Sequence, residues 1–159
     1  GYRIGWMILS GNKAIAKDYI EGIDMLTNMR ICSNVPAQSI VQTALGGHQS
    51  VNDYLVPGGR LYEQREYIYE ALNAIDGISA VKPKAAFYIF PKINTKKFNI
   101  HNDEQFALDL LHDEKLLIVQ GTGFNWKDPD HFRVVYLPRV EVLKGAVEKM
   151  TNFFSYYRQ

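Results

Sequence analysis

The sequence lacks several features that would place a protein in a functional class at once. A single cysteine, Cys32, excludes a disulfide within the chain and suits a reducing compartment. No apolar run is long enough to span a membrane, and no secretory signal opens the chain. The 18 basic and 17 acidic residues leave a net charge of +1, with no dense basic run. We therefore expect a cytoplasmic protein that binds neither nucleic acid nor a membrane.

Spacing patterns that define catalytic or metal sites are missing as well. The four histidines are scattered and have no pair of cysteines near them, so no metal site is expected. The segment 121–123, G-T-G, resembles part of a phosphate-binding loop but lacks the lysine that follows in such loops. No serine lies in a recognisable nucleophile elbow. For Cys32 we expect a small packed residue, not a nucleophile, so spacing alone assigns no catalytic residue.

The composition is that of a folded protein. Hydrophobic residues make up 47% of the 159 residues and charged residues 22%, which is typical of a globular domain. This length suits one domain, or one domain with a piece of another. The first residue is glycine, and the segment 1–6 has no polar lead-in, so the sequence reads as the middle of a longer protein.

In the first part of the chain the pattern predicts one strand and two helices. Residues 3–9 are apolar and are followed by Ser-Gly, which predicts a buried strand. Apolar residues recur at helical spacing over 13–29. A second helix is predicted over about 37–45, with Asn34 near its cap and Pro36 in its first turn.

In the second part of the chain, the spacing of apolar residues changes several times between that of a helix and that of a strand. A long helix is predicted over 61–75, a second behind a capping box formed by Asn102 and Gln105, and a third over 143–157. The strands are predicted at residues 78–81, 86–90, 116–119 and 132–137. This order predicts an α+β fold, with a small, mostly antiparallel sheet covered by helices and preceded by connecting helices.

Several segments, in the same order, resemble motifs of the class I (fold-type I) pyridoxal-phosphate-dependent aminotransferases. The matching segments are 1–6 (G-Y-R-I-G-W), 34–36 (N-V-P), 82–91 (K-P-K-A-A-F-Y-I-F-P), 119–124 (V-Q-G-T-G-F) and 131–135 (H-F-R-V-V). Two stretches, 57–65 and 119–139, look specifically like bacterial alanine aminotransferases. Ala85 replaces a usual glycine and Gln120 a usual proline of these motifs.

The resemblance implies a cofactor, pyridoxal 5'-phosphate, and two arginine ligands. By position in the motifs, Arg3 would bind the cofactor phosphate and Arg133 the α-carboxylate of the substrate. The planar guanidinium suits both, because it forms paired, charge-assisted hydrogen bonds with such oxygens. The lysine that holds the cofactor as a Schiff base comes shortly before the first motif in this family. No catalytic residue is therefore expected within the chain, and the chain alone is expected to be inactive.

The resemblance also implies an organisation for the intact protein. Residues 1–47 would be the end of the large cofactor-binding domain and the start of the connecting helices, and residues 48–159 a connecting helix and the small C-terminal domain. The intact protein would be a homodimer. It would transfer an amino group between an amino acid, alanine by resemblance, and a 2-oxo acid, 2-oxoglutarate by resemblance.

Other interpretations of the same residues stay open. Arg3 could be a plain surface arginine, and Arg133 could lie on the solvent face of a strand. Tyr88 could be a packed aromatic residue, and Arg30 a helix-terminal or salt-bridged one. Lys13 and Lys17 are expected to be solvated. The chain could also be a stand-alone α+β binding or interaction module, or the aminotransferase-like domain of a transcription regulator.

Overall fold

The structure, a computed structural model, describes residues 3–159. Gly1 and Tyr2 of the first motif lie outside the described residues. The chain divides into two compact units, of which the first ends at Ser50 and the second is Val51–Gln159.

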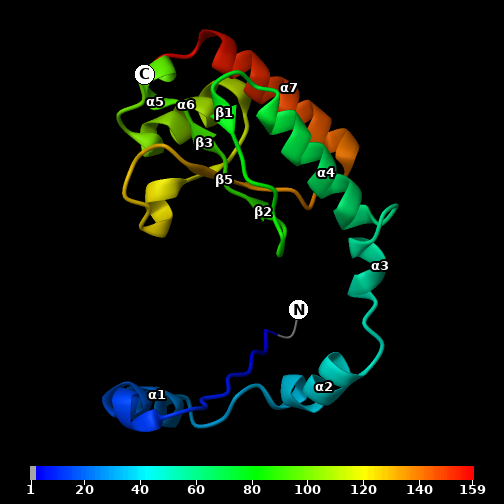
Figure 1. The fold of residues 1–159 in the computed structure, drawn as a ribbon, viewed down its shortest axis with the longest axis vertical. Helices are drawn as coiled ribbons and strands as arrows, with labels where there is room; N and C mark the ends of the chain where they lie inside the picture. Colours follow the sequence, from blue (N-terminus) through cyan, green and yellow to red (C-terminus); the bar gives the residue numbers. More distant parts are fainter. Residues whose placement is uncertain (1–2) are drawn as a thin grey trace. The chain divides into compact units, whose positions relative to one another are not determined.

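The first unit consists of helices. These are a 3-10 helix η1 (Lys13–Ala16) followed by α1 (Lys17–Arg30) and α2 (Val35–Gly46) (Figure 1). Asn34 is the N-cap of α2, where its side chain accepts a hydrogen bond from the Ala37 amide, and Pro36 lies in the first turn. A cap oxygen and a proline at this position both favour helix initiation, because they suit the unpaired amides of the first turn. Both helices predicted in this region are confirmed.

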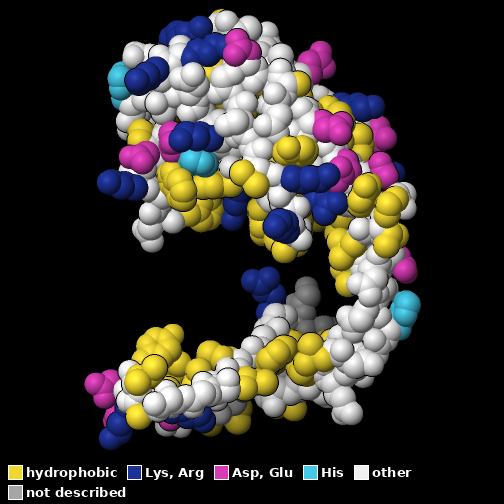
Figure 2. Space-filling view, viewed as in Figure 1, with side chains coloured by type: hydrophobic (Ala, Val, Ile, Leu, Met, Phe, Trp, Pro, Cys, Tyr) yellow, Lys and Arg dark blue, Asp and Glu magenta, His cyan; other side chains and the backbone are white. Residues whose placement is uncertain are grey.

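Two predictions for the first unit are wrong. Residues 3–9 do not form a strand, and Trp6, Met7 and Ile8 are exposed. A strand needs a partner for its backbone groups, and no strand of the described chain pairs with this segment. Cys32 is exposed and not packed. The helices also present apolar side chains to solvent, which Figure 2 shows as hydrophobic groups along this unit. Among the described helical residues of this unit, only Ala37 is buried.

The second unit is an α+β domain, as predicted. Its helices are α3 (Val51–Leu55), α4 (Arg60–Asn73), α5 (Thr95–Phe98), α6 (Asp103–Glu114), the 3-10 helix η2 (Gly121–Phe124) and α7 (Val140–Tyr156). Its strands are β1 (Ile78–Ser79), β2 (Tyr88–Ile89), β3 (Lys92–Ile93), β4 (Val119–Gln120) and β5 (Phe132–Val135). The strands form two antiparallel sheets, β1-β3 and β2-β5-β4. Helices α4 and α7 pack side by side along the sheets (Figure 1).

The strands are shorter than predicted and pair differently from a simple hairpin. The segments predicted at 78–81 and 86–90 are consecutive, yet β1 pairs with β3 and β2 with β5. Pro83 lies between them and has no amide hydrogen to donate to a ladder, which disfavours continuous pairing through 82–84. Strand β3 and the short helices α3 and α5 were not predicted, because segments of two to five residues carry too little periodicity.

The core of this domain is rich in aromatic side chains. Phe106 of α6 is fully buried, and its ring centroid lies 5.7 Å from those of Phe132 and Phe154 and 6.0 Å from that of Phe153. Phe132 belongs to β5, and the other two rings belong to α7. The cluster therefore packs one face of the three-stranded sheet against α6 and α7, and this packing holds β5 in position.

The start of α6 is held from the end of the chain. The Asn102 side chain accepts hydrogen bonds from the amides of Glu104 and Gln105, as a capping box predicts. The Gln105 side chain does not return to Asn102 and binds Asp109 instead. The Gln159 side chain takes that place: it accepts from the Asn102 amide at 2.7 Å and donates to the Asn102 carbonyl at 2.7 Å.

Candidate functional site

Arg133 lies on β5 between two aromatic rings. Its guanidinium carbon is 4.6 Å from the ring centroid of Tyr88 and 4.4 Å from that of Phe124. The register explains the first contact. Tyr88 of β2 pairs with Val135, which is two residues beyond Arg133 and therefore on the same face of the sheet. Two ring faces hold a guanidinium by cation–π attraction and restrict its rotation.

The guanidinium of Arg133 has no anionic partner among residues 3–159. No ion pair joins it to a carboxylate there, and its Nε is buried without a hydrogen-bond partner. A buried donor that is left unpaired costs free energy, and an arginine head group presents five N–H donors suited to two oxygens at once. The site therefore offers a pre-oriented cation to an anion such as a carboxylate.

The ring of Phe124 is positioned by the short helix η2. Both carboxylate oxygens of Asp103 accept from Thr122: Oδ2 from the amide at 2.9 Å and Oδ1 from the hydroxyl at 2.7 Å. The amide of Gly121 donates to the carbonyl of His131 at 2.8 Å. A Cβ at residue 121 would lie 2.7 Å from that carbonyl oxygen, so the close approach of the two segments requires glycine.

The other end of the same loop is tied by Asp130. Its carboxylate accepts from Trp126 Nε1 at 2.9 Å, from His131 Nδ1 at 2.6 Å and from Lys92 Nζ at 3.2 Å. Burial by itself raises the pKa of Asp130, but the hydrogen bonds from His131, Trp126 and Lys92 outweigh it and lower the pKa below its usual value. The Phe90 ring stacks on His131, with ring centroids 4.9 Å apart. Loop 121–131 is thus anchored at both ends.

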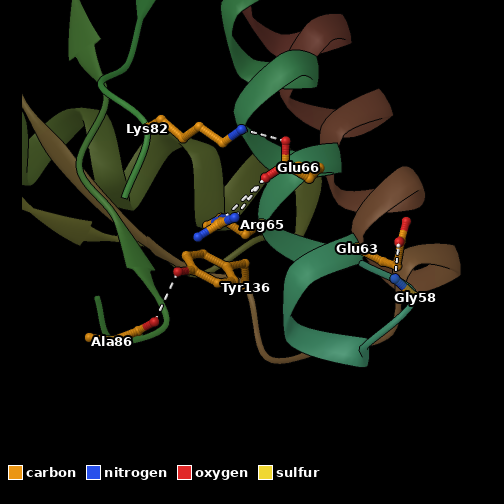
Figure 3. A network of polar contacts seen from close by, with 7 residues as sticks. All are labelled: Gly58, Glu63, Arg65, Glu66, Lys82, Ala86 and Tyr136. Atoms are coloured by element: carbon orange, nitrogen blue, oxygen red, sulfur yellow. Dashed lines mark hydrogen bonds and ion pairs between the residues drawn. The ribbon is translucent and has the colours of Figure 1, made fainter. Parts of the chain in front are cut away.

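Two other cations of this domain, Arg65 and Lys82, are neutralised by one carboxylate. Glu66 of α4 accepts from Arg65 and from Lys82, as Figure 3 shows. The hydrogen bond from Lys82 is the main cause of the lowered pKa of Glu66. Nearby, the Glu63 side chain accepts from the Gly58 amide ahead of α4 at 3.0 Å. Since Arg65 and Lys82 have a carboxylate partner, they differ from Arg133 and are not candidate ligands for an external anion.

The sequence is similar to that of bacterial aminotransferases. The chain is 58% identical over all its 159 residues to the glutamate-pyruvate aminotransferase AlaA of Haemophilus influenzae, and 56% identical to AlaA of Escherichia coli K12. It is 53% identical to the alanine aminotransferase of Mycobacterium tuberculosis. The chain belongs to the class I aminotransferases. It corresponds to their C-terminal part and spans 37–39% of the length of these relatives. No family model matches it.

Solved aminotransferase structures have the same fold. An aminotransferase from Escherichia coli matches 97% of this chain and 38% of its own with a TM-score of 0.89 at 56% identity. The alanine aminotransferase of Pyrococcus furiosus matches 90% of this chain and 35% of its own with a TM-score of 0.74 at 39% identity. The α+β domain is therefore that of the aminotransferase C-terminal region.

One position that departs from the aminotransferase motifs lies next to a residue with a left-handed backbone conformation. Ala85 stands where the family usually has glycine, and the left-handed conformation falls on the next residue, Ala86, with φ 58°. The hydroxyl of Tyr136 donates to the Ala86 carbonyl at 2.9 Å (Figure 3), and the Tyr136 amide donates to the Phe87 carbonyl at 3.1 Å. Burial raises the pKa of Tyr136, so the hydroxyl stays a donor. These bonds offset the strain of a positive φ at a residue with a Cβ.

The second predicted ligand of the aminotransferase site, Arg3, lies in the first unit. It is exposed, and it forms no hydrogen bond or ion pair with the other described residues. An exposed guanidinium has the donor chemistry for a phosphate, so this residue fits the cofactor that the family implies. Arg30 occupies the last turn of α1, as predicted, and Lys13 and Lys17 are exposed.

Residues outside the aminotransferase motifs also shape the site. The sequence interpretation did not single out Asp103 or Asp130, although Asp103 holds the turn that carries Phe124 and Asp130 holds the other end of loop 121–131. The one sequence feature that could have pointed to Asp103 is its position directly after the helix-capping residue Asn102. Within residues 3–159, no group of three or more His, Cys, Asp or Glu side chains could hold a metal ion. No helix of this part of the chain has both the length and the apolar character to cross a membrane.

Proposed function

We propose that the protein from which this chain comes is a pyridoxal-phosphate-dependent alanine aminotransferase. It transfers the amino group of alanine to 2-oxoglutarate, or in reverse that of glutamate to pyruvate. The 56–58% identity to glutamate-pyruvate aminotransferases over every residue of the chain carries this proposal. The unpaired guanidinium of Arg133, held between two rings, supports it with a feature that the reaction needs.

Two arginines of this chain have separate tasks in the proposed reaction. When bound, pyridoxal phosphate stabilises the negative charge that develops at the α-carbon of the amino acid. Arg133 binds the α-carboxylate through paired hydrogen bonds and fixes the orientation of the substrate. Arg3 binds the cofactor phosphate. The lysine that carries the cofactor belongs to the sequence before the first motif, so the chain alone is inactive.

The proposed protein is a cytoplasmic homodimer, and the chain contains parts of both of its domains. Residues 1–47 belong to the end of the large domain and the start of the connecting helices, and residues 48–159 to a connecting helix and the small domain. The boundary between the two compact units, at Ser50, supports this division. The exposed apolar side chains of the first unit support it too, since surfaces of this kind mark interfaces.

An amino-transfer assay on the intact protein tests the proposal. The protein loaded with pyridoxal phosphate is mixed with 2-oxoglutarate and one amino donor at a time, and the amino acid formed is followed by chromatography. We expect turnover with alanine, and slower turnover with aspartate or tyrosine as donor. Absence of amino transfer from both alanine and glutamate by folded, cofactor-loaded protein would contradict it. A reading frame that starts at Gly1 would instead favour a stand-alone binding module.

A further inference from the structure

Asp103 is a buried carboxylate that the proposed reaction does not use. It is 2% exposed and lies at the first position of α6. A carboxylate there is favourable for the helix dipole, but the helix is already capped by the side chain of Asn102. Both oxygens of Asp103 instead accept from one residue outside the helix, Thr122, at 2.9 and 2.7 Å. A buried charge that is fully engaged with a single loop residue constrains that loop strongly.

The loop held by Asp103 leads directly to the arginine of the carboxylate site. Thr122 and Phe124 belong to the same 3-10 turn, η2, and Phe124 is 45% exposed. Because so much of this ring lies outside the core, packing alone does not fix its position. Yet its ring centroid is 4.4 Å from the guanidinium carbon of Arg133. The bond from Asp103 to Thr122 is therefore a restraint on the ring that covers Arg133.

We propose that Asp103 is a positioning residue for the substrate-carboxylate site, acting through Thr122 and Phe124 on the guanidinium of Arg133. This inference rests on the proposed function. With the turn η2 fixed, Arg133 is confined between Phe124 and Tyr88 and its donors are oriented before the substrate arrives. When the turn is no longer held, Arg133 loses one of its two ring contacts and its side chain rotates more freely. Substrate binding then has to order this side chain, and the lost conformational entropy weakens the affinity.

The expected signature is a change in KM without a matching change in kcat. Arg133 contacts the carboxylate in the bound substrate and in the transition state alike, so a looser guanidinium weakens both equally. Mutations that act on a site through intervening residues typically change coupling by about 0.5–2 kcal/mol, which is roughly 2- to 30-fold in affinity.

The test compares two variants of Thr122 in the intact, cofactor-loaded protein. Thr122→Val removes the hydroxyl donor to Asp103 and keeps the shape of the side chain, whereas Thr122→Ser keeps the hydroxyl and is the matched control. We expect Thr122→Val and Asp103→Asn to raise the KM for alanine roughly 2- to 30-fold with kcat nearly unchanged. Thr122→Ser should stay near wild type. Thermal unfolding shows which variants remain folded at the assay temperature.

A double-mutant cycle with Arg133→Lys separates positioning from a purely structural role. If Asp103 acts through the guanidinium, Asp103→Asn should raise KM in the wild type and much less in the Arg133→Lys background. An equal increase in both backgrounds, or an unchanged KM in folded Thr122→Val, would overturn the proposal. Should Arg133→Lys itself leave KM unchanged, the carboxylate site of the proposed function fails as well. A large effect of Arg133→Lys with none from Thr122→Val rejects only the positioning role.

Discussion

Replacing Arg133 with alanine removes the guanidinium from between Tyr88 and Phe124 and leaves the two rings in place. No carboxylate of the described chain pairs with this group, so no buried anion is left without a partner in the folded protein. The variant should therefore fold, and its defect should appear when substrate binds. This separation of folding from binding makes Arg133 a better probe than a salt-bridged arginine such as Arg65.

The size of the effect follows from the loss of a shielded charge pair. Truncating one partner of a hydrogen-bonded charge pair typically costs about 2–5 kcal/mol. At about 1.4 kcal/mol per factor of ten, kcat/KM for alanine should fall roughly 30-fold to 4,000-fold. Arg133→Lys should recover only part of this loss. Lysine keeps the charge, but it lacks the planar fork that both binds two oxygens and stacks between Tyr88 and Phe124.

The assay is steady-state amino transfer by the intact protein at saturating pyridoxal phosphate. Arg139→Ala is the matched control, because Arg139 is exposed at the start of α7, beyond the end of β5. Retention of the cofactor, followed by its absorbance after gel filtration, should not change in Arg133→Ala. If the folded variant has kinetics near wild type, the assignment is wrong, and Arg133 is a residue of the sheet surface without a role in binding.

Three further predictions concern the cofactor and the loop. Arg3→Ala in the intact protein should weaken cofactor retention, and excess pyridoxal phosphate should restore part of the activity; an activity loss that added cofactor does not relieve would contradict the assigned phosphate contact. The 159-residue chain alone, mixed with pyridoxal phosphate and reduced with borohydride, should give no stoichiometric adduct on one specific lysine. Such an adduct, together with turnover of alanine by the unreduced chain and cofactor, would show the expectation of inactivity to be wrong. The pKa of Asp130 is lowered in the folded state, so its stabilising contribution is present above the ordinary value of 3.8 and is lost as the pH falls through the lower folded value. Urea unfolding between pH 2 and pH 5 should therefore show a weaker pH dependence for Asp130→Asn than for wild type, and equal dependences would refute this account.

Helical periodicity and capping residues predicted the helices, whereas strand pairing was not predictable. Asn34, Pro36 and Asn102 act on backbone groups within three residues, so their effect can be recognised locally. The pairing of Ile78 with Ile93 depends on segments fifteen residues apart, which no local pattern encodes. The apolar run 3–9 shows the opposite failure, because its composition favours a strand but the described chain provides no partner for it.

The candidate site shows a similar division between local and distant information. A motif singled out Arg133, since the residue types around it are characteristic of a family. Its ring contacts join three separate segments of the chain: Arg133 lies on β5, Phe124 on the turn η2 and Tyr88 on the neighbouring strand β2. The hydrogen bond between Thr122 and Asp103 joins residues nineteen positions apart. Both residue types are common, so neither one marks the contact in the sequence. Only the folded chain shows that these side chains meet.

The contacts of Gln159 mean that a change at this one position would affect a helix whose N-cap lies 57 residues earlier in the chain. Replacing Gln159 with alanine would free the amide and carbonyl of Asn102 from their side-chain partner. Asn102 directly precedes Asp103. Disorder at the start of α6 would therefore weaken the hydrogen bonds between Asp103 and Thr122, and with them the restraint on the loop beyond Thr122. Any change at Gln159 is therefore also a change at the start of α6, and kinetic comparisons that concern the loop should be made with Gln159 intact.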